Sequence, residues 1–243
     1  MARPQETLTL PARAWRIERG KALAVSALCW AGFLLLVWLV ATGRAAGFDK
    51  PGLLFWRTGA GLVAKGPQYL PEAVRDLTSL GGVLLRNLIA LGAMAALVFL
   101  RLRREAVLLA LTVTGAWLVE ATVKGLVGRP RPEIVPHLTE AGGASFPSGH
   151  AFNSAVVYIA IALAFATLSA RESVRLTIIG SAIVLSLVIG WSRVWLGVHF
   201  PSDVIAGWLG GAGWAFLAAA LLQRPADAAA DSEAADKLDP TIH

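Results

Sequence analysis

Three short segments of this 243-residue chain bring ionisable side chains together within an otherwise apolar sequence. The last of them, SRVWLGVHFPSD at residues 192–203, contains Arg193, His199 and Asp203. His199 and Asp203 are four residues apart, so they share one face if a helix begins near Pro201. A carboxylate bonded to one imidazole nitrogen fixes the tautomer and makes the other nitrogen a better nucleophile. The spacing indicates a nucleophile with its orienting group; the alternative is a polar contact that caps the helix.

A second segment, FPSGHAFNSA at residues 146–155, indicates an anion site next to a proton donor. Ser148 is a favourable helix N-cap, and Gly149 lets the backbone approach a ligand closely. The free N–H groups at a helix start attract anions. His150 follows directly and could protonate a leaving oxygen. The alternative is a histidine that only borders the membrane interface.

The first segment along the chain is KGLVGRPRP, residues 124–132. Lys124 offers a point charge and Arg131 a planar fork of donors, a combination that suits the oxygens of a phosphate. Glu120 lies one helical turn before Lys124, where it can hold the amine in place. The alternative is a pair of basic residues that extend from a span end toward the headgroups.

The three segments together supply what phosphoryl transfer needs. They offer cations for the phosphoryl oxygens, a helix N-terminus, a nucleophile and an acid for the leaving group. No histidine and carboxylate cluster has the spacing of a metal site. We therefore expect metal-independent chemistry without a cofactor.

The three motifs resemble the signature of the type 2 phosphatidic acid phosphatase superfamily, K-x6-R-P, then P-S-G-H, then S-R-x5-H-x3-D. Three ordered motifs with fixed spacing are far more specific than any one alone. The resemblance covers residues 120–205 in detail and residues 20–222 loosely. The matching residues are Lys124, Arg131, Pro132, Pro147, Ser148, Gly149, His150, Ser192, Arg193, His199 and Asp203.

This resemblance implies a lipid phosphatase that works through a phosphohistidine. His199 would attack phosphorus while Asp203 orients it, and His150 would protonate the leaving oxygen before water releases phosphate. The remaining residues implied at the site are Lys124, Arg131, Arg193, Ser148, Gly149 and Ser192 for substrate binding, with Pro132 and Pro147 in support. Glu120 supports Lys124 by its spacing alone.

The composition predicts the elements that must position these residues. A hydrophobic content of 56% and a mean hydropathy of +0.62 require a second apolar solvent besides a protein core. Apolar runs of about 18 or more residues are long enough to cross a bilayer. We predict an all-α bundle of six transmembrane helices with the active site at the extracytoplasmic face. The spans are 22–42, 83–100, 106–123, 150–169, 174–191 and 203–222.

The net charge of +6 is spread over short connections, which favours membrane topology over nucleic-acid binding. Arginines in the connections 101–104 and 171–175, together with the basic segment 1–21, place those ends in the cytoplasm by the positive-inside rule. We expect a cytoplasmic segment 1–21, a phosphatase domain 22–222 in a bacterial inner membrane, and a disordered cytoplasmic tail 223–243. The single Cys29 excludes an intrachain disulfide.

Several features have two interpretations from sequence. The extracytoplasmic loop 43–82 contains interfacial helices or a simple connector, and Pro71 suits the first turn of a short helix. Gly207 and Gly211 have a GxxxG spacing that favours packing within the bundle over a dimer face. Arg86 and Asn87 contact either the headgroup or other helices, Glu133 and His137 are more typical of a solvated loop, and Trp195 is expected at the interface.

The signature does not name the lipid. Undecaprenyl diphosphate, phosphatidylglycerol phosphate, phosphatidate and a lipid A phosphate all present a phosphate at headgroup level. A phosphotransferase with the same site is the nearest alternative to hydrolysis. A non-enzymatic lipid transporter is the alternative of another class, but transport does not require the His199 and Asp203 pair beside His150. The oligomeric state is open.

Overall fold

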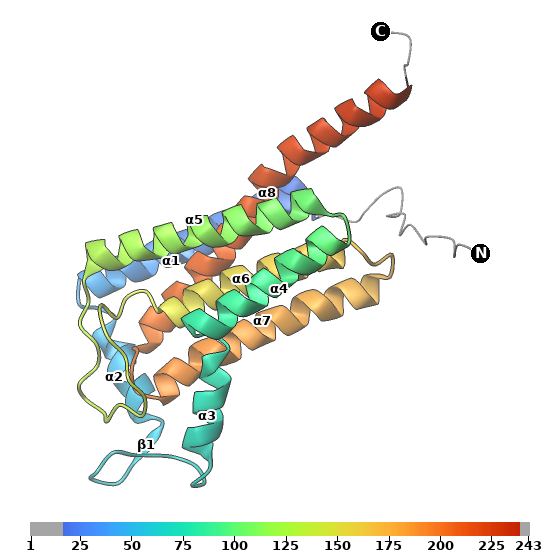
Figure 1. The fold of residues 1–243 in the computed structure, drawn as a ribbon. Coiled ribbons are helices and arrows are strands. Elements are labelled where there is room, and N and C mark those ends of the chain that lie inside the picture. Colours follow the sequence, from blue (N-terminus) through green and yellow to red (C-terminus); the bar gives the residue numbers. More distant parts are fainter. Residues whose placement is uncertain (1–16, 239–243) are drawn as a thin grey trace.

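The structure, a computed structural model, describes residues 17–238, and their side chains as far as residue 221. Long helices lie side by side and form a bundle (Figure 1). The rest of segment 1–21 and the last five residues lie outside the described part. The elements are α1 (Arg19–Ala41), α2 (Ala46–Leu54), β1 (Arg57–Thr58), β2 (Val63–Ala64), α3 (Leu70–Ser79), α4 (Val83–Phe99), α5 (Arg103–Val127), α6 (Gly149–Ala166), α7 (Glu172–Trp195) and α8 (Pro201–Leu238).

The predicted all-α membrane bundle is confirmed. Within the described residues, five helices are long and apolar enough to cross a membrane, namely α1, α5, α6, α7 and the part of α8 up to Leu221. The number becomes six if the pair α3 and α4, which bends by 45° at a short break, is counted as one span. The break lies at Leu80–Gly82, because two successive glycines lower the cost of leaving the helical conformation there.

Helix α8 packs against α1 and α6. A Cβ atom on Gly207 would lie 2.6 Å from the carbonyl oxygen of Ser148, and one on Gly211 would meet the carbonyl oxygen of Phe152. These glycines therefore let α8 approach the backbone of α6 within one chain. The GxxxG spacing serves packing inside the bundle, which is the interpretation that the sequence favoured over a dimer face.

The segment between α1 and α4 is more structured than a connector. Helix α3 begins at Leu70 with Pro71 in its first turn, as predicted, while α2 and the antiparallel pair β1–β2 were not predicted in detail. Elements α2, β1 and α3 lie together beyond one end of the bundle (Figure 1). This segment therefore forms the wall around that end.

Two predictions about the ends of helices need correction. Helix α8 continues to Leu238, so the backbone of 223–238 is helical where we expected a disordered tail. This stretch is rich in alanine, the strongest helix former. Trp195 at the end of α7 is 1% exposed and packs against Val74, Leu196 and Val198, so it lies in the protein interior instead of the membrane interface.

Candidate active site

The three motifs meet at the end of the bundle next to α2 and α3 (Figure 1). Arg131 Nη1 lies 3.1 Å from His199 Nε2, which joins the first motif to the third. The backbone N–H of Ser148 donates to the carbonyl oxygen of Asp203 at 2.9 Å, which joins the second motif to the third. Lys124 lies beside Gly149, which joins the first motif to the second. The predicted convergence of three loops is therefore present.

Lys124 is held as the sequence predicted. Its Nζ lies 2.6 Å from Glu120 Oε1, one helical turn earlier on α5. A Cβ atom on Gly149 would lie 2.9 Å from that carboxylate oxygen and 3.2 Å from Lys124 Nζ. Gly149 therefore has a second reason to be glycine besides ligand approach. It makes room for the ion pair against the start of α6.

The start of α6 presents a free hydroxyl and the second histidine. Ser148 occupies the N-cap position, but its side chain makes no capping bond, and its buried Oγ has no hydrogen-bond partner among the described residues. Such a group costs free energy unless a ligand satisfies it. His150 follows within one turn and interacts electrostatically with Arg193, His199, Arg86 and Lys124. This end of α6 therefore suits an anion with a proton donor beside it.

The tautomer of His199 follows from its neighbour. A guanidinium can only donate, so Arg131 Nη1 at 3.1 Å requires a lone pair on His199 Nε2. The proton of the neutral ring is then on Nδ1, which faces Asp203 Oδ2 at 3.6 Å. That separation is longer than a hydrogen bond, and Nδ1 has no other partner in the described residues. Nε2 is therefore the ring nitrogen that carries the lone pair.

His199 lies between α7 and α8 and is 2% exposed. Burial, together with the cations Arg131 and Arg193, lowers the pKa of His199 to about 4, although the carboxylate of Asp203 partly offsets these effects. Because that pKa lies far below neutrality, the ring is uncharged at pH 7. It therefore retains the lone pair that nucleophilic attack needs.

Asp203 has more partners than the sequence indicated. Its Oδ2 accepts a hydrogen bond from the backbone N–H of Phe200 at 2.9 Å and another from the Ser145 hydroxyl. Its Oδ1 accepts from Arg129 Nη1 at 2.6 Å. The carboxylate is therefore fixed by both the helix start and side chains before it orients His199.

Arg129 and Asp49 were not recognised from sequence. Arg129 Nη2 lies 2.7 Å from Asp49 Oδ2, while its Nη1 contacts Asp203 and the Ser202 hydroxyl. Asp49 also accepts the backbone N–H of Ser202 at 2.9 Å. Arg129 stands in the same KGLVGRPRP segment as Lys124, which was a usable signal. Asp49 lies on α2, far away in sequence, and no local pattern marks it.

The third motif begins with two buried residues on α7. Arg193 is 4% exposed, donates to Thr78 Oγ1 of α3 at 3.1 Å and leaves its Nε without a partner among the described residues. Ser192 is fully buried and lies 2.8 Å from the same threonine oxygen and 2.6 Å from the carbonyl of Ile189. Its hydroxyl is used within the protein. The contact of Ser192 with phosphate that the resemblance implies stays a prediction.

The connection from α5 to α6 folds over the site and is held by Arg131. This side chain donates to the carbonyl oxygens of Gly142 at 2.7 Å and Val198 at 2.9 Å. Burial lowers the pKa of Arg131 somewhat, and Asp203 opposes that effect. Pro132 and Pro147 are both buried in this connection. Arg131 therefore links the loop to His199 through one guanidinium.

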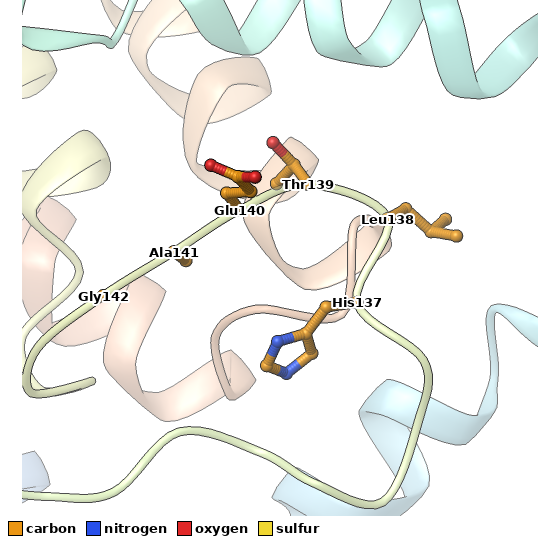
Figure 2. A pocket seen from close by; sticks show the side chains of 6 residues that line it. All are labelled: His137, Leu138, Thr139, Glu140, Ala141 and Gly142. Carbon is orange, nitrogen blue, oxygen red and sulfur yellow. The ribbon is translucent and has the colours of Figure 1, made fainter.

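An open hollow of about 660 Å³ lies in the same connection (Figure 2). Residues 137–142 alone line it, and no residue of the three motifs is among them. His137 and Glu140 are exposed, and His137 Nε2 contacts the carbonyl oxygen of Pro132 at 2.6 Å. The hollow is a feature of one loop and not the site where the motifs meet. Glu133 is exposed in the same loop, so Glu133 and His137 both fit the interpretation that they belong to a solvated loop.

The arrangement is strongly electropositive where His150 and His199 meet. Neither Arg131 nor Arg193 has a carboxylate ion-pair partner in the described part of the chain, and Lys124 shares Glu120. Cations in a site of low dielectric bind an anion more strongly than they would in water. The site therefore suits a phosphate or another compact anion, with the uncharged imidazole of His199 beside it.

Comparisons with known proteins agree with this chemistry. Residues 105–226, half of the chain, match the PAP2 superfamily. Phosphatidylglycerophosphatase B of Bacillus subtilis is 34% identical over 145 residues, which cover 57% of this chain and 68% of that protein. Lipid A 1-phosphatase of Rhizobium etli is 35% identical over 120 residues, which cover 46% of this chain and 47% of that protein.

A solved structure supports the fold. The crystal structure of a transmembrane PAP2-type phosphatidylglycerolphosphate phosphatase from Bacillus subtilis aligns with a TM-score of 0.70. The alignment covers 82% of this chain and 96% of that one at 24% sequence identity. At this identity the likeness concerns the fold alone, and it extends over nearly all of the bundle.

Proposed function

The chain belongs to the PAP2 superfamily, and from that premise we propose that it is an integral-membrane phosphatase that hydrolyses a phosphomonoester or diphosphate on a lipid headgroup. The names of the matched relatives, a phosphatidylglycerophosphatase and a lipid A phosphatase, support a lipid substrate. The apolar helices around the site support delivery of that substrate from the bilayer. Candidate substrates are undecaprenyl diphosphate, phosphatidylglycerol phosphate and phosphatidate.

In the first proposed step, His199 Nε2 attacks phosphorus and forms an N–P bond. The bond between phosphorus and the leaving oxygen breaks, and His150 gives that oxygen its proton. Lys124, Arg131 and Arg193 neutralise the charge on the three other phosphoryl oxygens. The free Ser148 hydroxyl and the N–H groups at the start of α6 are further donors.

In the second step, water attacks the phosphohistidine. His150, now neutral, takes a proton from that water, the N–P bond breaks and inorganic phosphate leaves. Electrostatic stabilisation comes from side chains of the protein in both steps. We therefore expect activity without a metal ion.

One observation carries the proposal. His199 Nε2 bears a lone pair at 3.1 Å from Arg131, a residue suited to binding the phosphoryl group under attack. The same imidazole is buried, uncharged and backed by Asp203 at 3.6 Å. A lipid transporter has no need of a neutral imidazole with a fixed tautomer beside phosphate-binding cations.

The test uses protein purified in detergent, with several lipid phosphates and a chelator present. Released phosphate is measured, and an alkaline quench after a brief reaction traps the phosphohistidine. We expect wild type to release phosphate and His199→Ala to lose both turnover and the trapped intermediate. No release by wild type, or full release by His199→Ala, contradicts the proposal.

His150 offers a control for the assignment of roles. His150→Asn should slow an alkyl phosphate far more than an aryl phosphate such as p-nitrophenyl phosphate, because a good leaving group needs no proton. Equal losses of kcat/KM on both substrates would remove His150 from the acid role, because kcat/KM reports the first step and not the later attack of water. We further propose that the protein lies in a bacterial inner membrane with this site on the outer side and with segment 1–21 and the end of α8 in the cytoplasm.

A further inference from the structure

A cavity of about 360 Å³ lies between α4, α5 and α6, beside the site. Its polar lining comes from Arg86, Asn87, Thr114 and Asn153, and Asn153 Nδ2 donates to the carbonyl oxygen of Gly149 at 3.1 Å. The cavity therefore reaches the start of α6, where the second motif lies. Its remaining lining is apolar: Val83, Ala90, Leu91, Met94, Val113 and Trp117.

Arg86 is an incompletely satisfied buried cation. It is 4% exposed, and its only hydrogen bond within the described chain is from Nη1 to the carbonyl oxygen of Gly81 at 3.1 Å. Its buried Nε has no partner, and none of the ion pairs in the described chain includes it. Glu120, which interacts with it electrostatically, is already bonded to Lys124 at 2.6 Å. A buried guanidinium with free donors is costly unless it binds something.

The position of Arg86 relative to His150 shows on which side of the site this cation lies. A Cβ atom on Gly81 would lie 3.0 Å from His150 Cδ2, and the carbonyl of the same glycine accepts the hydrogen bond from Arg86. Arg86 therefore lies next to the proposed leaving-group acid. Arg131, by contrast, contacts the nucleophile His199 directly. The extra cation is on the side of the site where the leaving group departs.

The number of cations exceeds what one phosphoryl group needs. Lys124, Arg131 and Arg193 match its three non-bridging oxygens. A fourth cation on the leaving side has a role if the leaving group is itself anionic. A phosphomonoester leaving group meets that condition, while the leaving group of a simple lipid monophosphate, once His150 has protonated it, departs as a neutral alcohol.

We propose that Arg86, with the cavity between α4, α5 and α6, forms a leaving-group subsite for the second phosphoryl group of a lipid diphosphate. This inference rests on the function proposed above. His199 Nε2 bonds to the terminal phosphorus, and the bond from that phosphorus to the bridging oxygen breaks. The leaving lipid monophosphate takes the proton of His150, and its charge is held by Arg86. Water then releases the terminal phosphate.

The apolar part of the cavity suits the lipid that follows this phosphate. Leu91 is 59% exposed and Trp117 is 60% exposed, so both border the lipid-facing surface of α4 and α5. The apolar lining continues from Arg86 toward that surface. A chain attached to the bound monophosphate can therefore pass from the subsite into the bilayer.

The test compares farnesyl phosphate with farnesyl diphosphate, which share one chain, in mixed detergent micelles. Arg86→Gln should lower kcat/KM for the diphosphate roughly 10- to 100-fold, the size expected for a lost charge-assisted hydrogen bond, and change the monophosphate value by less than about threefold. Arg86→Lys keeps the charge and should retain most of the preference. Lys124→Gln is the matched control, because it removes a cation from the attacked phosphoryl group and should lower both values equally.

The outcomes separate the two proposals. Equal losses on both substrates with Arg86→Gln, an unchanged ratio, or a wild type that hydrolyses only the monophosphate overturns the subsite and leaves the phosphatase function intact. A wild type that hydrolyses neither lipid overturns the function itself. If Arg86→Gln does not fold, Arg86→Lys decides. A partial fall in kcat/KM for the diphosphate at unchanged kcat/KM for the monophosphate shows the subsite, because the charge remains but the guanidinium fork is lost. Equal falls on both lipids, or no change on either, refute it.

Discussion

A single carboxylate connects helix initiation with chemistry in this protein. Asp203 accepts the backbone N–H of Phe200, the residue before α8, which is the geometry of a capping box. The same carboxylate faces His199 Nδ1 at 3.6 Å. The helix cap, one of the two interpretations of this residue from sequence, is therefore confirmed, and the orienting role stays a prediction. Fixing the cap also fixes the carboxylate against the nucleophile.

Arg129 extends this arrangement to α2, and we predict that it acts as a positioning residue. Arg129→Gln removes the partner of Asp203 Oδ1 and leaves Asp49, which is 1% exposed, without its ion pair. Breaking a buried pair from one side costs about 3 kcal/mol or more. We expect kcat to fall roughly tenfold or more while KM changes less than about threefold, because Arg129 contacts Asp203 and not the proposed phosphate site.

The double variant Asp49→Asn with Arg129→Gln provides the control. It removes the unpaired charge on α2, so the apparent Tm in detergent should recover toward wild type while kcat stays low. The rate of phosphohistidine formation after an alkaline quench reports the same defect directly. A kcat that recovers together with Tm would mean that Arg129 only stabilises the fold.

At the scale of elements, local patterns could predict the spans and the motifs, but not the wall around the site. Long apolar runs and the fixed spacing of K-x6-R-P or S-R-x5-H-x3-D are properties of contiguous sequence. Asp49 on α2 and Thr78 on α3 reach Arg129 and Arg193 only through the fold. Aspartate and threonine are common in any loop of mixed polar and apolar composition, so the local sequence does not mark these two residues. Sequence could therefore indicate the candidate reacting residues and a partner nearby in the chain, such as Glu120, but not the partners that only the fold brings close.

The contact between α6 and α8 gives a prediction about elements. Gly211→Ala places a Cβ against the carbonyl oxygen of Phe152, and the two helices must separate because a backbone atom cannot yield. We expect a loss of about 1–3 kcal/mol in stability, the usual cost of overpacking. Activity should fall as well, because Ser148 on one side donates to Asp203 on the other. The apparent Tm in detergent and phosphate release measure the two effects.

Gly180→Ala in α7 is the matched control for this variant. An added Cβ there meets nothing within 4 Å, so only the helix propensity changes. It should leave activity unchanged and stabilise the protein by up to about 1 kcal/mol. If Gly211→Ala has the same apparent Tm and the same rate of phosphate release as Gly180→Ala, the close approach of α6 and α8 is not required.

At the scale of the whole molecule, the two ends of the bundle use basic residues differently. The end with the site contains Arg57, Arg129 and Arg131, and protein carbonyls or carboxylates hold all of them. Their presence there has a structural reason that is independent of topology. The opposite end has arginines in two short connections, which is the pattern of a cytoplasmic face: Arg101, Arg103, Arg104, Arg171 and Arg175.

This asymmetry predicts that the site faces outward, and single cysteines can test it in intact cells. Cys29 is buried and is replaced by serine to give a background without thiols. Glu140→Cys near the site and Arg171→Cys at the other end are both at exposed positions. A membrane-impermeant maleimide should label Glu140→Cys in intact cells and Arg171→Cys only after permeabilisation. The reverse pattern would place the phosphatase site on the cytoplasmic side, where its substrate would have to come from the inner leaflet.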